Sequence, residues 1–225
     1  LVTGPTGSGK STTLYSALAQ MDSERLNVST VEDPVEYNLE YCNQVQVNER
    51  AGMTFSAALR SMLRQDPDII MIGEIRDQET ARIAVQAALT GHLVLSTLHT
   101  NDAPSSVSRL VNIGIEPYLI AASLNGILAQ RLVRRICSHC KETCKVTDSV
   151  KKFLDRASIQ IPELVRGKGC DKCRNSGYAG RAGIFELLVV DEEFRRIINE
   201  DSSVSSMRKA FVKSGWPCLF DDGLQ

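Results

Sequence analysis

Short apolar runs alternate along the chain with amphipathic segments in which apolar residues recur at helical spacing. Residues 69–72 read Ile-Ile-Met-Ile, a fully apolar run typical of a parallel strand that is covered on both faces. By contrast, residues 45–47 form a weaker run and suit an edge strand. The pattern predicts strands at residues 1–3, 27–31, 45–47, 69–72, 93–98 and 183–188.

Helix starts are marked by residues that commonly cap helices. Thr54 and Asp77 each precede an apolar face at helical spacing, and Asp102 is followed by Pro104. We predict helices at residues 11–18, 54–64, 77–89, 102–112 and 116–136, with two more between 191 and 214. Strands that alternate with helices predict an α/β fold with a mainly parallel sheet.

Composition narrows the class of protein. The 225 residues are 43% hydrophobic and 24% charged, with a formal net charge of −1, which does not favour a dedicated nucleic-acid binder. No apolar run is long enough to span a membrane, and the start lacks the features of a signal peptide. We expect a globular protein in a reducing compartment. Since only three residues precede Gly4, we also expect a fragment that begins inside a strand.

The segment from Gly4 to Ser11 fits the phosphate-binding motif G-x-x-x-x-G-K-[ST], the P-loop. Its glycines allow backbone N–H groups to surround a polyphosphate, Lys10 would reach the β- and γ-phosphates, and Ser11 would hold Mg²⁺. The alternative is a Gly/Ser/Lys-rich surface turn, but a predicted strand before the motif and a predicted helix after it favour nucleotide binding. The candidate binding residues are Gly4, Pro5, Thr6, Gly7, Ser8, Gly9, Lys10, Ser11 and Thr12.

Three further polar residues follow predicted strands. Glu32, Glu74 and His99 come at or just after strand ends, and ligands bind at the carboxyl ends of strands in open α/β sheets. A carboxylate there can hold Mg²⁺ or orient an attacking water, and a histidine can contact a γ-phosphate. Each acidic residue could instead be a helix cap, and a single histidine is more often structural. His92 precedes its strand, so we interpret it as structural.

Seven cysteines include two C-x-x-C pairs separated by residues 141–169. Four thiolates at this spacing predict a closed, structural zinc site. A redox pair and unrelated buried cysteines are the alternatives, and Cys144 is either a free thiol or a substitute ligand. Because composition changes at the first pair, we predict a P-loop core over 1–136, a zinc-binding module over 137–180 and a C-terminal strand and helical segment over 181–225. The predicted ligands are Cys137, Cys140, Cys170 and Cys173.

Four blocks together resemble the secretion ATPases, the motors of type II secretion and type IV pilus assembly. In order, they resemble that family's Walker A, Asp box, Walker B and His box. The match covers nearly the whole chain. The blocks are VTGPTGSGKSTTLY (2–15), TVEDPVE (30–36), LRQDPDIIMIGEIRD (63–77) and TGHLVLSTLHTND (90–102).

The resemblance implies a RecA-like core, a hexameric ring and hydrolysis of ATP with Mg²⁺. It implies that Glu32 activates water, that Glu74 acts at the metal and that His99 lies near the γ-phosphate. It also implies a cytoplasmic location at the inner membrane, with secretion or pilus machinery as partners. The resemblance also implies an N-terminal domain, which we expect to be missing from this fragment. A zinc module marks its secretion and pilus-extension motors rather than its retraction motors.

We therefore predict an ATPase that powers type II secretion, with pilus assembly as the alternative. A nucleic-acid translocase and a non-hydrolysing scaffold are more distant alternatives. ATP is preferred over GTP because no Asn-Lys-x-Asp motif is present. The basic run at 131–135 is interpreted as a solvated helix end, although it could contact a neighbouring subunit or acidic lipid. Arg60, Arg64 and Arg76 could contact nucleotide or carboxylates.

Overall fold

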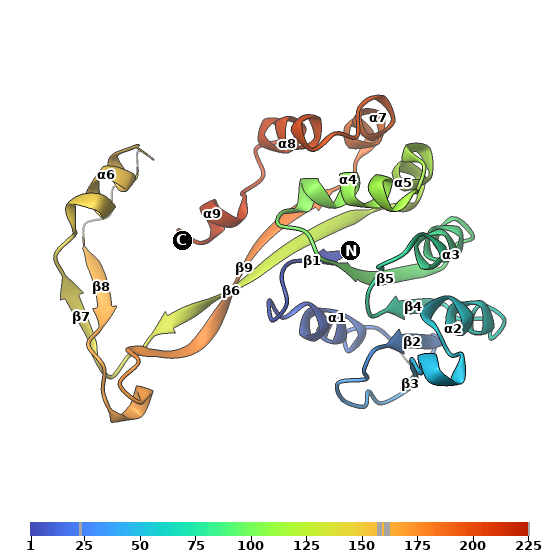
Figure 1. Ribbon diagram of the computed structural model, residues 1–225, viewed down its shortest axis with the longest axis horizontal. Helices are drawn as coiled ribbons and strands as arrows, with labels where there is room; N and C mark the ends of the chain where they lie inside the picture. Colours follow the sequence, from blue (N-terminus) through green and yellow to red (C-terminus); the bar gives the residue numbers. More distant parts are fainter. Residues whose placement is uncertain (23, 157–158, 160–162, 225) are drawn as a thin grey trace. The chain divides into compact units, whose positions relative to one another are not determined.

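A computed structural model describes residues 1–22, 24–156, 159 and 163–224 (Figure 1). The chain divides into two compact units, of which the first comprises residues 1–131 and 184–225 and the second residues 132–183. Within the described residues, no helix combines the length and the apolar character needed to cross a membrane.

The described residues form a sheet of seven strands in the order β3-β2-β4-β5-β1-β6-β9 (Figure 1). All neighbouring pairs from β3 to β6 are parallel, which confirms the predicted α/β fold. Parallel pairing brings the carboxyl ends of these strands to one edge of the sheet. The strands are β1 (Val2–Thr3), β2 (Val28–Glu32), β3 (Cys42–Gln46), β4 (Ile69–Ile72), β5 (Leu93–Leu98), β6 (Gly126–Ile136) and β9 (Tyr178–Val189).

Helices cover both faces of this sheet, which explains the continuous apolar run in β4. Ile70 and Ile72 pack in a large core with the helices of one face, whereas Ile69 and Met71 pack with α1 on the other face. Thr54, Asp77 and Asp102 accept backbone N–H bonds as N-caps, as predicted. The helices of the first unit are α1 (Lys10–Leu18), η1 (Glu49–Ala51), α2 (Phe55–Met62), α3 (Gln78–Leu89), α4 (Ala103–Ile113), α5 (Pro117–Ser123), α7 (Glu192–Glu200), α8 (Val204–Lys213) and α9 (Leu219–Asp222).

The predicted helix over 116–136 is wrong. Only α5 is helical there, and β6 follows it as a strand parallel to β1, with Val2 opposite Leu128. Ile127 and Ala129 are buried in the larger core, while Leu128 packs against the smaller core on the opposite face. The spacing of the apolar residues in this segment is compatible with the period of a helix and with that of a strand. Pairing with β1 favours the strand, because it satisfies backbone groups around Leu128 and Ala129 where β6 is packed on both faces.

Glu186 on β9 connects the last helix, α9, to α4. This buried carboxylate accepts one N–H bond from Ala103 at the start of α4 (2.8 Å) and another from Leu219 at the start of α9 (3.2 Å). The anionic side chain therefore faces the amino ends of two helices, where backbone N–H groups lack helical partners. Trp216 stacks on Phe194 of α7 in the same region.

The second unit is built from short elements around the cysteine pairs. Strands β7 (Lys141–Cys144) and β8 (Leu164–Gly167) pair in antiparallel fashion, and helix α6 (Asp148–Arg156) and the 3-10 turn η2 (Asp171–Cys173) complete it. The guanidinium of Arg134 lies 3.9 Å from the centre of the Tyr178 ring. Gly167 and Gly177 approach so closely that a Cβ on either would collide with the other's backbone.

Candidate nucleotide-binding site

The glycine-rich loop between β1 and α1 has the backbone geometry that phosphate binding requires. Gly7 (φ 76°) and Gly9 (φ 88°) have left-handed conformations that favour glycine. A Cβ on Gly4 would collide with the carbonyl oxygen of Gln130 on β6. Gly9 is the N-cap of α1 and, having no side chain, makes no side-chain cap bond to the N–H groups of the first turn. A helix start of this kind presents its dipole and N–H donors to an anion.

Lys10 is buried at the start of α1, where its ammonium donates to the carbonyl oxygens of Gly4 (3.0 Å) and Pro5 (3.1 Å). Burial lowers the pKa of Lys10, and the charge of Arg131 lowers it further, while the carboxylate of Glu74 opposes both. Close to it, the buried hydroxyl of Ser8 has no hydrogen-bond partner among the described residues. An unpaired hydroxyl and a cation held by loop carbonyls both suit a polyphosphate ligand.

Glu74 and His99 meet because they follow neighbouring parallel strands. Ile72 of β4 lies opposite Ser96 of β5, and each chain then continues beyond the same edge of the sheet. Nε2 of His99 lies 3.2 Å from one carboxylate oxygen of Glu74, and Nε of Arg76 donates to the other at 2.8 Å. The side chain of Glu74 is mostly buried and the other two are more exposed.

Glu32 ends β2 and is buried in a different set of contacts. One carboxylate oxygen accepts bonds from Thr30 (2.6 Å) and Gln44 (3.0 Å), and the other accepts the hydroxyl of Tyr15. Gly73 passes close to its backbone, so a Cβ on Gly73 would lie 3.4 Å from Cα of Glu32. Glu74 therefore contacts His99 and acts on Lys10 through its charge, whereas Glu32 is held by neutral donors.

Two other polar residues noted in the sequence, His92 and Arg60, have local partners. His92 lies between α3 and β5, where Nδ1 is 2.9 Å from the carbonyl oxygen of Ala87. Arg60 on α2 pairs with Glu79 on α3 at 2.5 Å. Ser11 and Thr12 lie exposed on the first turn of α1, directly beside Lys10.

The sequence interpretation missed two residues in the middle of β6. Gln130 accepts a bond from Thr13 of α1 (2.7 Å), and Arg131 donates to the carbonyl oxygen of Asn101 (2.7 Å), two residues after His99. The other terminal nitrogen of Arg131 is buried and has no partner within the described part of the chain. The signal was available in principle, because a strand at 126–136 beside β1 would deliver these residues to the P-loop.

Four cysteines of the second unit converge. Their sulfur atoms all lie within 4.8 Å of one another. Three of the separations are 4.0 Å (Cys137–Cys170), 3.8 Å (Cys140–Cys173) and 3.7 Å (Cys170–Cys173). Tetrahedral ligands at Zn–S distances of about 2.3 Å would be about 3.8 Å apart, so the donor set fits zinc. Cys144 is not part of this cluster.

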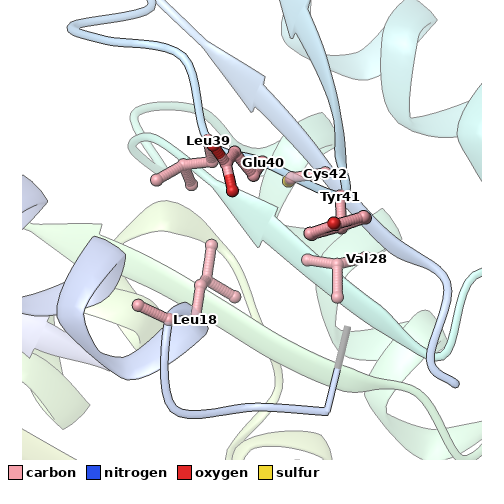
Figure 2. A pocket seen from close by; sticks show the side chains of 7 residues that line it. Leu18, Val28, Leu39, Glu40, Tyr41 and Cys42 are labelled. Atoms are coloured by element: carbon pink, nitrogen blue, oxygen red, sulfur yellow. The ribbon is translucent and has the colours of Figure 1, made fainter. Parts of the chain in front are cut away.

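A cavity of about 240 Å³ lies elsewhere in the first unit and is unrelated to the P-loop (Figure 2). It is formed at the carboxyl end of α1 and the amino ends of β2 and β3, which is the sheet edge opposite Lys10. Its lining includes Leu18, Val28, Leu39, Glu40, Tyr41 and Cys42 (Figure 2).

The parallel sheet, the P-loop before α1 and the polar residues at the same sheet edge define a P-loop protein of the α/β class. A family model described as "Type II/IV secretion system protein" matches residues 1–225, and the chain belongs to that family. This confirms the resemblance drawn from the four sequence blocks.

Some curated relatives are named as type II secretion proteins and others as type IV pilus assembly ATPases. The chain is 54% identical to the type II secretion system protein HxcR of Pseudomonas aeruginosa, covering 99% of this chain and 44% of that protein. It is 52% identical to type II secretion system ATPase E of Vibrio cholerae (100% and 44%) and to the type IV pilus assembly ATPase PilB of Thermus thermophilus (100% and 25%). The chain therefore spans less than half the length of these relatives.

Solved structures give the same fold. The ATPase DotB of Legionella pneumophila aligns with a TM-score of 0.69 and 28% identity, covering 98% of this chain and 53% of that one. The pilus retraction motor PilT with bound ADP aligns with a TM-score of 0.66 and 31% identity, covering 98% and 59%.

Proposed function

We propose that this chain is the ATP-hydrolysing part of a motor that powers type II protein secretion. The observation that carries the proposal is the shared sheet edge, where the buried Lys10 lies within the electrostatic reach of Glu74 and Glu74 contacts His99. Relatives that are named as type II secretion proteins, at 52–54% identity, support type II secretion as the process that the motor powers. Assembly of type IV pili is the second candidate, because PilB of Thermus thermophilus is also 52% identical.

In this proposal the chain binds ATP through its backbone and Lys10. The free N–H groups of the first turn of α1 and the ammonium of Lys10 hold the β- and γ-phosphates. The hydroxyl of Ser11 and the carboxylate of Glu74 hold Mg²⁺, which neutralises charge on the phosphates when it is bound. His99 contacts the γ-phosphate, and its bond to Glu74 fixes the orientation of the ring.

Glu32 accepts the proton of the attacking water in this proposal. A carboxylate that is buried and hydrogen-bonded keeps a fixed direction, which is what alignment of a nucleophile needs. Arg131 is assigned here as an additional contact to the phosphates, because one of its N–H groups is buried without a partner among the described residues. The division of roles between Glu32 and Glu74 is part of the proposal.

We further propose a structural zinc ion held by Cys137, Cys140, Cys170 and Cys173. Four thiolate ligands leave no open coordination position, so the metal would stabilise the second unit and take no part in hydrolysis. Burial raises the pKa of Cys140 to about 12. Burial also acts to raise the pKa of Cys173, but hydrogen bonds from the backbone of Cys170 and Gly177 and from neighbouring thiols outweigh it and lower that pKa to about 6.

The family resemblance also implies an assembly and a location. We propose a homo-hexameric ring that works at the cytoplasmic side of the inner membrane, on secretion machinery embedded there. A nucleotide-dependent change in molecular mass, measured by light scattering of the intact protein, tests the ring. A mass that stays at one subunit under all nucleotide conditions would contradict it.

Steady-state hydrolysis by the intact protein tests the enzymatic proposal. Lys10→Ala should abolish nucleotide binding and turnover, whereas Glu74→Gln should retain binding and lose turnover. Lys209→Ala, on the exposed face of α8, is the matched control and should leave both unchanged. An inactive parent, or undiminished rates in both site variants, would defeat the assignment. Stimulation by DNA would favour a nucleic-acid translocase instead.

A further inference from the structure

Glu32 is a buried carboxylate whose donors come from three different elements. The residue is 4% exposed, and its hydrogen bonds come from Tyr15 on α1, Thr30 on its own strand and Gln44 on β3. All of these donors are neutral, and both carboxylate oxygens are engaged. Burying an anion is costly unless it is well hydrogen-bonded, so the donors hold this carboxylate in one orientation.

Tyr15 is the donor that connects Glu32 to the nucleotide loop. Its side chain is 1% exposed, and its hydroxyl donates to Glu32 while it accepts the backbone N–H of Glu36 at 3.3 Å. Burial and the bond to Glu32 raise the pKa of Tyr15 well above its ordinary value, so the phenol stays a neutral donor. The ring also packs edge-on against Tyr37, with 4.5 Å between ring centres.

The same helix begins at Lys10, five residues earlier, about one and a half turns away. A helix of this length is a rigid element, so the position of its first turn and the position of the Tyr15 hydroxyl are linked. Helix α1 therefore contacts both the phosphates bound at its first turn and, through Tyr15, the carboxylate at the end of β2.

We propose that Tyr15 is a positioning residue for Glu32, which it holds in the orientation needed to act on water beside the bound nucleotide. The inference rests on the proposed function and extends it to a residue that does not touch the substrate. Thr30 and Gln44 fix one carboxylate oxygen, and among the described residues Tyr15 is the donor to the other. Removing the phenol hydroxyl leaves that oxygen buried without a donor, and the carboxylate loses its fixed direction.

The test is a double-mutant cycle in the intact protein with Tyr15→Phe, Glu32→Gln and the pair. Tyr15→Phe should lower kcat about tenfold, because bonds to charged groups contribute more than neutral ones, and should leave nucleotide affinity within about twofold. In the Glu32→Gln background the same substitution should change kcat less than about twofold, since Tyr15 acts through Glu32. Tyr118→Phe, which alters an exposed phenol on α5, is the matched control and should change nothing.

The outcomes separate the two proposals. A parent protein that hydrolyses ATP, combined with additive losses in the cycle, would overturn the positioning role and leave the proposed function standing. A loss of nucleotide affinity as large as the loss of kcat would also overturn it, because Tyr15 would then support binding in general. A parent without hydrolysis would instead defeat the proposed function itself. Thermal unfolding of each variant establishes that the compared proteins are folded.

Discussion

Nε2 of His99 and a carboxylate oxygen of Glu74 lie 3.2 Å apart, although 25 residues separate them in the chain. Their contact is a consequence of the parallel pairing of β4 with β5, which brings both residues to the same sheet edge. The contact orients the imidazole ring toward Glu74, whose negative charge also raises the pKa of Lys10 against the larger effect of burial. An imidazole held in this way is preorganised to stabilise charge on a phosphate.

Replacement of His99 tests this arrangement. His99→Gln should lower kcat for ATP by about a hundredfold, as removal of one preorganised donor does in other sites, with little change in nucleotide affinity. Steady-state rates and equilibrium binding of a nucleotide analogue measure the two quantities. His92→Gln is the matched control, because His92 bonds locally to the end of α3. Equal losses in the two variants would show that His99 has no special role.

Arg131 gives a second prediction, from its unpaired N–H group. If that group contacts the γ-phosphate, Arg131→Gln should weaken binding of ATP about tenfold and binding of ADP much less, since charged hydrogen bonds contribute about 1.5–3 kcal/mol. Calorimetric titration with both nucleotides measures the difference. Arg135→Gln changes an exposed guanidinium of the same strand and serves as the control. Parallel losses for ATP and ADP would place Arg131 away from the γ-phosphate.

The P-loop and the strand-end residues could be predicted because the parallel topology alone determines where strand ends lie. Predicting Lys10, Glu74 and His99 as site residues required only the order of the strands and helices and the rule that ligands bind at the carboxyl ends of parallel strands. The contact between Tyr15 and Glu32 could not be predicted in this way. It depends on the rotation of α1 about its own axis and on the depth at which it packs, and neither is encoded in local spacing.

The error at β6 has a different cause. The apolar residues of 126–136 have a spacing that suits a helix as well as a strand. Pairing with β1 therefore determines the secondary structure of this segment. Because of this misassignment, Gln130 and Arg131 were not predicted as site residues. A helix at these positions would not have placed them beside the nucleotide loop. The convergence of the two C-x-x-C pairs, in contrast, followed directly from their spacing.

The cysteine cluster predicts a metal content that elemental analysis can measure. Protein prepared without chelator should contain about one zinc ion per chain. Cys140→Ser should lose most of it and lower the thermal stability of the second unit, because metal binding and folding are coupled in small sites. Cys144→Ser is the matched control, since this sulfur lies outside the cluster. Metal-free wild-type protein with unchanged stability would contradict the proposed site.

The ion pair between Asp102 and Arg208 predicts a pH dependence of stability. Asp102 caps α4 and accepts bonds from Arg208 at 2.5 and 3.0 Å. Burial opposes ionisation of Asp102, but bonds from Ser105 and Arg208 outweigh it and hold its pKa below the ordinary 3.8. A carboxyl with a depressed pKa stabilises the folded state above about pH 4 and loses this effect as pH falls through its lower folded value.

Arg208→Gln should therefore lower the free energy of unfolding by about 1 kcal/mol at pH 7, a value that allows for the half-exposed guanidinium. The difference from wild type should shrink as pH falls below 3.8, because protonated Asp102 no longer attracts the cation. Urea unfolding followed by fluorescence of Trp216, the one tryptophan of the sequence, reports on the unit that holds this pair. Arg196→Gln removes an exposed pair with Glu200 and should cost less than half as much. A deficit for Arg208→Gln that stays constant from pH 7 to pH 3 would mean that packing of the side chain, and not its charge, stabilises the start of α4.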